Sequence, residues 1–365
     1  TWKRDPYAPL FYAMLLRDGF DGQGNPGEGQ KEAVRVVEDV LKERPGSQAA
    51  LFMRALLEEV APSIYPATVE TARRAVSANP FSASAHHLLG HCLFRTGDYE
   101  GASAAFKESE NLCLAWEKAE NVSPALDDAY FRSILYRAVS EFCAGRYKRA
   151  EAIASRAASV PLDKKHPLAP GTLLQLWEAR TLPARLMLAR PGLPRQALVL
   201  KAFPGPLPKG FPDLSNGMTA VASQYMGACY AARQGRTDAV ASAFDKMSGI
   251  LRLLMDGADA ARRQMSVSYW ARCLQTGSLY SSEIRSLMFP DSANVWMSEA
   301  IRSQRFSSLL LPPVVPYPAE WVLARAYLKA GKFRECADMC EQALKRFPNH
   351  AGVLETLDKA RSSGK

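Results

Sequence analysis

The stretch ASAHHLLGHCLFRTGDYEGASAAFKESENL, residues 83–112, decides the fold of this chain, because it holds two segments of helical apolar spacing separated by Gly97. Gly90 and Ala102 are small enough to let two helices approach closely, while Phe106 fills the space around that contact. Gly97 can end the first helix, since glycine adopts the left-handed backbone conformation without steric cost. The stretch therefore predicts an antiparallel pair of helices.

The pattern recurs along the chain. A second strong copy, EWVLARAYLKAGKFRECADMCEQALKRFP, occupies residues 320–348. Two weaker copies surround Gly145 and Gly235, so that turn glycines are expected at positions 97, 145, 235 and 331. Pro45 and Pro80 close two earlier units and lie 35 residues apart. Repetition at this scale predicts a stack of helical pairs.

These copies resemble the tetratricopeptide repeat family, whose period is about 34 residues. The matching positions are Leu89-Gly90, Gly97-Asp98-Tyr99, Ala102 and Phe106 in the first copy, and Leu323-Ala324, Tyr327, Gly331, Phe333, Ala343 and Pro348 in the second. The resemblance implies an all-α fold, a right-handed α-solenoid of antiparallel helix pairs in a TPR-like superhelix. Segments 161–212 and 257–317 depart from the pattern, and their geometry is not predicted.

Proline and glycine mark two breaks in the helical pattern. Residues 203–212 are too rich in both for a helix, so we expect a hinge at 204–213 between an N-terminal TPR-like array, 1–203, and a C-terminal array, 214–365. One continuous solenoid is the alternative. The second break is Leu311–Pro318, which contains four prolines.

Composition and charge narrow the class of protein. No apolar run reaches the roughly 20 residues that a membrane-spanning helix needs, so no membrane insertion is expected. The net charge of +9 is scattered over short pairs such as Arg73-Arg74, which does not favour nucleic acid as a partner. Seven cysteines at mostly inward-facing positions indicate free buried thiols. Free thiols favour the cytoplasm, whereas a signal peptide removed before Thr1 would indicate the periplasm or secretion.

In the tetratricopeptide family the first helix of each pair lines a concave groove that holds the partner. The resemblance places these residues in that groove: His87, His91, Phe94 and Arg95 in the best repeat, Arg132, Tyr225 and Arg233 in weaker repeats, and Trp321, Arg325, Leu328 and Lys329 in the last. Aromatic anchors among basic side chains suit a peptide that carries carboxylates. The alternative for each position is an ordinary solvated side chain.

Two motifs near the start of the chain have the residue spacing of a dinucleotide-binding loop and of a calcium-binding loop, but the residues around them do not fit either site. Residues 22–27 read G-x-G-x-x-G, yet the segment before them has helical rather than strand spacing, so a loop between helices is expected. Four residues have the spacing of calcium ligands: Asp21, Gln23, Asn25 and Glu32. Pro26 stands where a calcium loop needs glycine, so no calcium site is expected.

Two pairs of residues have the spacing of metal ligands but lack the rest of a metal site. His87 and His91 lie one helical turn apart, but Leu88 occupies the place of a zinc protease glutamate and no third ligand can be named. Cys336 and Cys340 share this spacing, but they fall at core positions of the last repeat. We therefore expect no catalytic, cofactor or metal residues and no enzyme activity.

The sequence thus predicts a non-catalytic scaffold that binds a protein or peptide in a helical groove. Its alternatives are an RNA-binding helical repeat protein and an accessory domain of an enzyme complex. The oligomeric state and the identity of the partner are not predicted.

Overall fold

The structure confirms an all-α protein. The computed structural model describes residue 5 and residues 7–62, 65–257, 267–305 and 311–364, and across these ranges the elements are helices, apart from one β-bridge between Phe20 and Pro26. None of the helices described there is long and apolar enough to cross a membrane. The chain divides into two compact units, Thr1–Trp116 and Glu117–Lys365, which we call the first and second units.

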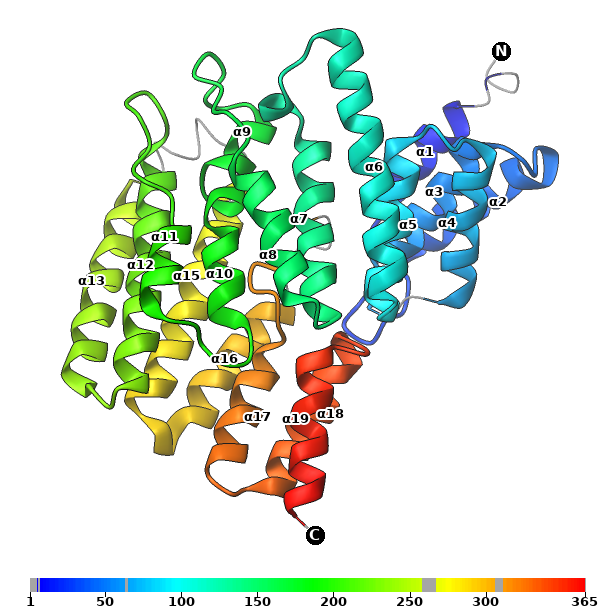
Figure 1. Cartoon of the computed structure of the whole chain (residues 1–365). Helices are drawn as coiled ribbons and strands as arrows, with labels where there is room; N and C mark the ends of the chain where they lie inside the picture. Colours follow the sequence, from blue (N-terminus) through cyan, green and yellow to red (C-terminus); the bar gives the residue numbers. More distant parts are fainter. Residues whose placement is uncertain (1–4, 6, 63–64, 258–266, 306–310, 365) are drawn as a thin grey trace. The chain divides into compact units, whose positions relative to one another are not determined.

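The first unit is built from helices paired in chain order (Figure 1). Its helices are α1 (Ala8–Leu16), α2 (Glu28–Glu43), α3 (Gln48–Glu59), α4 (Pro66–Ala78), α5 (Ala83–Thr96) and α6 (Tyr99–Glu120), the last of which continues into the second unit. α1 packs on α2, and α3 packs on α4. Pro45 and Pro80 lie in the connections between successive pairs, as the sequence predicts.

The second unit continues the pairing. Its helices are α7 (Asp128–Cys143), α8 (Tyr147–Ala158), α9 (Pro170–Leu174), η3 (Gln175–Ala179), α10 (Arg180–Ala189), α11 (Gln196–Ala202), α12 (Asp213–Arg233), α13 (Thr237–Asp256), α15 (Val267–Met288), α16 (Ala293–Arg305), α17 (Ala319–Lys329), α18 (Phe333–Arg346) and α19 (Ala351–Ser363), with short turns η2 (Pro124–Leu126) and η4 (Pro290–Ser292). α7 packs on α8, α12 on α13, α15 on α16 and α17 on α18.

The four predicted turn glycines all adopt the left-handed conformation. Gly97, Gly145, Gly235 and Gly331 have φ values of 80°, 78°, 70° and 71°, and each lies between the two helices of a pair. A side chain with a Cβ is strained there, so glycine fixes where each hairpin turns. The sequence predicts these positions because glycine is the residue that most readily adopts the left-handed conformation of the turn.

The close contact predicted within the best repeat is also present. A Cβ placed on Gly90 would lie 2.8 Å from Cε1 of Phe106, which is itself fully buried on α6. Ala102 is buried beside it on the same helix. The missing side chain at residue 90 therefore sets the distance between α5 and the aromatic ring.

The proline- and glycine-rich stretch predicted as a hinge lies inside the second unit. Leu207 and Phe211 are buried, and the Leu207 N–H donates to Asn216 Oδ1 at 3.0 Å. Arg180 donates to the Gly205 carbonyl at 3.0 Å. The two compact units meet at Trp116, within α6, and the hinge at 204–213 stays a prediction.

The cysteines are free thiols, as expected. Six of the seven are buried and Cys229 is half-buried. Cys336 and Cys340 have no exposed surface, which confirms that they pack in the core of the last repeat. Burial raises the pKa of both thiols.

We predict that Gly90→Ala lowers the free energy of unfolding by about 1–3 kcal/mol, because the new methyl group overlaps the Phe106 ring. Gly249→Ala, in the middle of α13, is the matched control. No atom lies within 4 Å of a Cβ built there, so the helix should gain about 0.5–1 kcal/mol. Urea denaturation followed by circular dichroism measures both, and equal effects would contradict the packing described here.

Candidate binding site

The structure separates the eleven predicted groove residues into two groups. Four are core residues, with exposed fractions of 2% for His91, 7% for Phe94, 7% for Tyr225 and 1% for Trp321. A partner cannot reach these side chains in this conformation, so their assignment to a binding surface is corrected. The other seven are half-buried or exposed: His87, Arg95, Arg132, Arg233, Arg325, Leu328 and Lys329.

The predicted cluster of the best repeat holds neighbouring helices together. His91 Nδ1 lies 3.1 Å from a carboxylate oxygen of Glu59, which ends α3, and both side chains are buried. Arg95 donates to the Pro62 carbonyl at 3.1 Å, and also to the carbonyls of Glu59 and Ala61. These side chains therefore join α5 to the end of α3 instead of facing a ligand.

The aromatic residue predicted in the last repeat is part of its core. Trp321 donates from Nε1 to Thr356 Oγ1 at 2.8 Å, and its ring packs where a Cβ on Gly352 would otherwise lie. The Arg325 guanidinium lies over the same ring, 4.4 Å from its centroid. Trp321, which the family pattern places in a groove, thus packs α17 against α19.

Leu311–Pro318, which we call the inner segment, occupies the interior of the second unit. It connects α16 to α17 and runs among the other helices of the unit (Figure 1). Leu311, Val314, Val315 and Tyr317 are each at most 8% exposed. The sequence predicts the break in helix here but not its burial.

Side chains from distant parts of the chain bind the backbone of the inner segment. Tyr136 Oη donates to the Leu311 carbonyl at 2.9 Å and Arg272 to the Pro312 carbonyl at 3.0 Å. Arg185 donates to Val314 O at 2.5 Å and Gln304 to Tyr317 O at 2.7 Å. At the Pro316 carbonyl, Cys143 Sγ donates at 3.8 Å and His350 Nε2 lies 3.4 Å away. Side chains from several helices of the second unit therefore hold the inner segment in place.

The buried carboxylate of Glu283 accepts a hydrogen bond from Tyr317 of the inner segment. Tyr317 Oη lies 3.0 Å from both carboxylate oxygens of Glu283, and Tyr225 donates to the same group. The Tyr225 ring stacks on Tyr280, with centroids 4.0 Å apart. Burial raises the pKa of Glu283 although both hydroxyl groups act to lower it. Tyr225, predicted in a groove, thus binds the chain's own segment.

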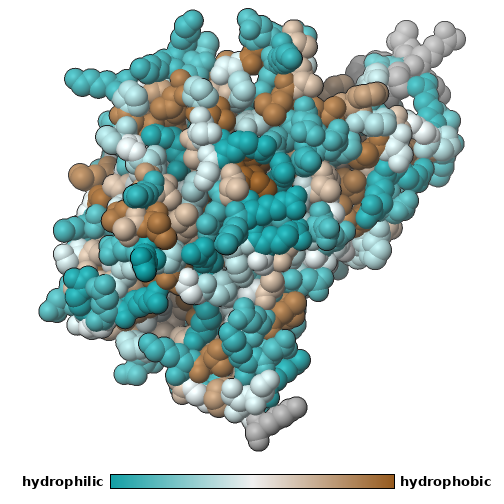
Figure 2. Space-filling view, in the orientation of Figure 1, coloured by the Kyte–Doolittle hydropathy of each residue, from teal (hydrophilic) through white to brown (hydrophobic). Residues whose placement is uncertain are grey.

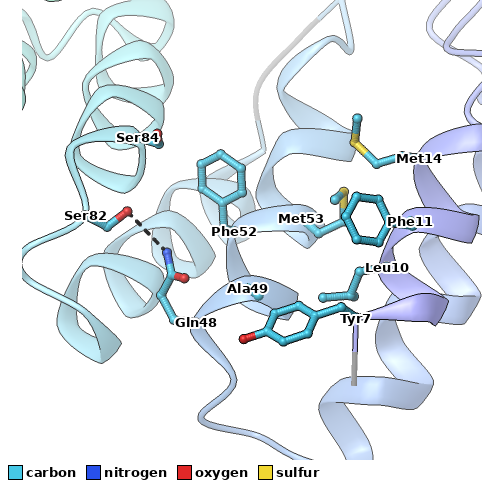
Figure 3. Close-up of a pocket in the computed structure, with 10 residues that line it drawn as sticks. All are labelled: Tyr7, Leu10, Phe11, Met14, Gln48, Ala49, Phe52, Met53, Ser82 and Ser84. Atoms are coloured by element: carbon cyan, nitrogen blue, oxygen red, sulfur yellow. Dashed lines mark hydrogen bonds between the residues drawn. The ribbon is translucent and has the colours of Figure 1, made fainter. Parts of the chain in front are cut away.

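An open apolar hollow lies in the first unit and involves different residues (Figure 3). Its volume is about 310 Å³, near the lower end of the range for ligand pockets. We call it the α1 pocket, and its lining is Tyr7, Leu10, Phe11, Met14, Gln48, Ala49, Phe52, Met53, Ser82 and Ser84. The lining comes from the first helices of three successive pairs, α1, α3 and α5.

Polar groups lie along one side of the α1 pocket. Gln48 Nε2 lies 3.5 Å from Ser82 Oγ, joining the starts of α3 and α5 (Figure 3). Ser82 also accepts the N–H of Ala85 as the N-terminal cap of α5. The opposite wall is apolar, with Phe11 70% exposed and Met14 42% exposed.

Sequence reasoning missed this pocket, although α1 carries a signal for it. Ala8–Leu16 reads APLFYAMLL and has no charged residue on any face. A helix packed on one side by α2 and α3 cannot bury every face, so some apolar side chains must remain exposed. Leu10 and Ala13 are buried, while Phe11 and Leu15 are not.

The glycine-rich motif at 22–27 is a loop between α1 and α2, as predicted. Asp21 accepts the N–H groups of Gln23 at 2.9 Å and Asn25 at 2.8 Å, which closes the turn internally. Elsewhere, the ring of His87 packs edge-on against Phe106. Across the described residues, histidine, cysteine and acidic side chains do not gather in groups of three or more that could hold a metal ion.

We predict that Trp321→Ala lowers the free energy of unfolding by about 3–5 kcal/mol, because it empties a fully buried site and leaves Thr356 without its donor. Lys329→Ala, at an exposed position on the same helix, should change stability by less than about 0.5 kcal/mol. Chemical denaturation distinguishes the two. A similarly small change in stability for both variants would indicate that Trp321 is exposed and not part of the core.

His350 predicts a dependence of stability on pH. Burial lowers its pKa to about 4 from an ordinary 6.5, so between these values the unfolded chain takes up a proton that the folded chain does not. Stability should therefore fall as the pH drops below 6.5, by about 2 kcal/mol at pH 5 relative to pH 7.5. His350→Asn keeps a capping side chain without titrating there, so its loss over the same range should be smaller by that amount. Urea titrations of the parent and of His350→Asn at pH 7.5 and pH 5 measure the two losses. An equal loss of stability in both proteins would contradict the prediction.

Comparison with known proteins agrees with the helical pairs. Residues 65–111, which include the best repeat, match the family model described as "Tetratricopeptide repeat". No curated protein matches the sequence significantly. Among solved structures, the P58(IPK) TPR domain is 16% identical over 92% of this chain and 94% of that chain, with a TM-score of 0.29. The Naa15/Naa10 complex bound to HypK-THB gives 14% identity, 92% and 61% coverage and a TM-score of 0.21.

TM-scores this low do not establish a common overall arrangement, so the assignment depends on the sequence match and on the hairpins themselves. The four left-handed glycine turns and the contact between Gly90 and Phe106 agree with the repeat pattern described from the sequence. Residues 65–111 are therefore a tetratricopeptide repeat, within a chain of helices packed in sequential pairs.

Proposed function

We propose that the chain is a non-catalytic scaffold that binds another protein or peptide through the α1 pocket. Tetratricopeptide repeats generally mediate protein interactions, and the proposal assigns that role to a particular surface of the first unit. The observation that carries it is an open apolar hollow lined by the first helices of three successive pairs.

Exposure alone does not mark the pocket. Hydrophobic side chains appear in several separate patches on the face shown in Figure 2, as on most protein surfaces. The α1 pocket differs because its exposed residues are contiguous and surround a hollow, with Tyr7 at 58% and Phe11 at 70% exposed beside buried Leu10. Contiguous apolar surface rimmed by polar groups is typical of protein interaction sites.

The lining indicates the chemistry of the partner. Phe11 and Phe52 provide aromatic walls, while Met14 and Met53 provide flexible ones that adapt to the shape of an inserted side chain. A hollow of this size takes a large apolar anchor such as leucine or phenylalanine. Polar groups flanking that anchor would lie beside Ser82 and its neighbours.

A preference for acidic partners, expected from basic residues in the groove, has less support. The Arg95 guanidinium binds backbone carbonyls, and that of Arg325 lies over an aromatic ring. Both cations are therefore already engaged within the protein. We propose apolar insertion, rather than carboxylate capture, as the main source of affinity.

Selection from a phage library of random 12-residue peptides tests the proposal. Enriched peptides should share a large apolar residue and bind the purified chain in a direct titration. The variant Phe11→Ser with Met14→Ser should bind them at least about tenfold more weakly, because the walls of the pocket are removed.

A matched control is available in the second unit. Leu253→Ser with Met255→Ser removes one aliphatic residue and one methionine that are similarly exposed, at 74% and 58%, on α13. Binding should be unchanged in this control, and thermal stability should be near that of the parent in both variants. Peptides that bind the pocket variant as tightly as the parent would refute this site.

A further inference from the structure

We infer that the interior of the second unit is a binding site for a proline-rich peptide and that the chain's own inner segment occupies it. This site is distinct from the α1 pocket and does not depend on it. A proline-rich backbone has few N–H donors but keeps its carbonyl acceptors, and the surrounding helices supply side-chain donors to those carbonyls.

Proline changes the hydrogen-bonding needs of a buried backbone. Four of the eight residues of the inner segment are proline, so half of its backbone N–H donors are missing while all of its carbonyl acceptors remain. A buried carbonyl without a donor costs free energy. A surface that binds such a segment must therefore present mainly donors.

The helices of the second unit present such donors. Tyr136, Arg272, Arg185 and Gln304 each donate to a different carbonyl of the inner segment. The first three are 175, 40 and 129 residues away from their acceptors along the chain. α7, α10 and α15 thus form a wall that meets the inner segment much as it would meet a separate peptide.

Two buried arginines favour occupancy of this site. Arg272 pairs with Glu178, with both N–O distances 2.6 Å, and directs a further donor at the Pro312 carbonyl. Arg185 is 5% exposed, and its hydrogen bonds include the Glu178 carbonyl at 2.7 Å and the Val314 carbonyl at 2.5 Å. Removing the inner segment would leave both guanidinium groups facing an empty interior, which favours binding of a replacement of the same chemistry.

The side chains of the inner segment add specificity. Tyr317 places its hydroxyl group 3.0 Å from Glu283 and 3.2 Å from Tyr225 Oη. Val314 and Val315 are each 3% exposed. The site therefore recognises the order of the residues in LPPVVPYP as well as its backbone.

The test uses the full chain with residues 311–318 replaced by eight alternating glycine and serine residues. A fluorescent peptide of sequence LPPVVPYP should bind this variant saturably and raise its melting temperature, but should not bind the parent, whose site is occupied. A peptide with phenylalanine in place of tyrosine should bind about tenfold more weakly, because the contact with Glu283 is lost. A peptide of reversed sequence should not bind.

The variant tests the inference even if it does not fold alone. It is then refolded from urea with and without each peptide, and recovery of the helical circular-dichroism signal with LPPVVPYP only supports the site. The inference is overturned if a folded variant does not bind the peptide, if no peptide restores folding, if the reversed peptide acts equally well, or if the parent binds LPPVVPYP as tightly as the variant does.

Discussion

A pair of helices buries only part of the surface of each helix, and the faces that remain must be covered by something else. Stacking of successive pairs covers one of them, which is why small residues such as Gly90 and left-handed turns such as Gly97 recur along the chain. The inner faces of the first helices are left over. The two units of this protein deal with those faces in opposite ways.

In the second unit, the inner faces are polar and covered from within. Arg185, Arg272 and Glu283 are buried, and each binds the inner segment. In the first unit the corresponding faces of α1 and α3 are apolar and remain open at the α1 pocket. In the second unit, the chain itself supplies the hydrogen-bond partners of the buried polar groups. In the first unit, the exposed apolar surface would be stabilised by contact with another molecule.

The repeat architecture could be predicted from the sequence because its determinants are local. Gly97 and Gly331 lie directly between the two helices that each of them joins, and the contact of Gly90 with Phe106 lies within one hairpin. Spacing along the chain is enough to find such features. The position of Cys336 and Cys340 within the last repeat likewise predicts that they lie in the core, and both are buried.

The binding surfaces could not be predicted in the same way. A family pattern places Tyr225 and Trp321 on a groove, but whether a groove is open depends on segments far away in sequence, and Leu311–Pro318 fills this one. Prolines showed that this segment is not helical, without showing where it lies. Conversely, helical spacing predicts the helix that precedes residues 22–27 but does not show that Phe11, on that helix, is 70% exposed.

Helical repeats ordinarily fold from local contacts, and each repeat depends mainly on its neighbours. The inner segment changes this for the second unit, because its bonds to Tyr136 and Cys143 close loops of 175 and 173 residues. Such distant contacts raise the contact order and slow the search for the native state. The second unit should accordingly fold in one cooperative step and lack the partly unravelled ends that longer repeat arrays tolerate.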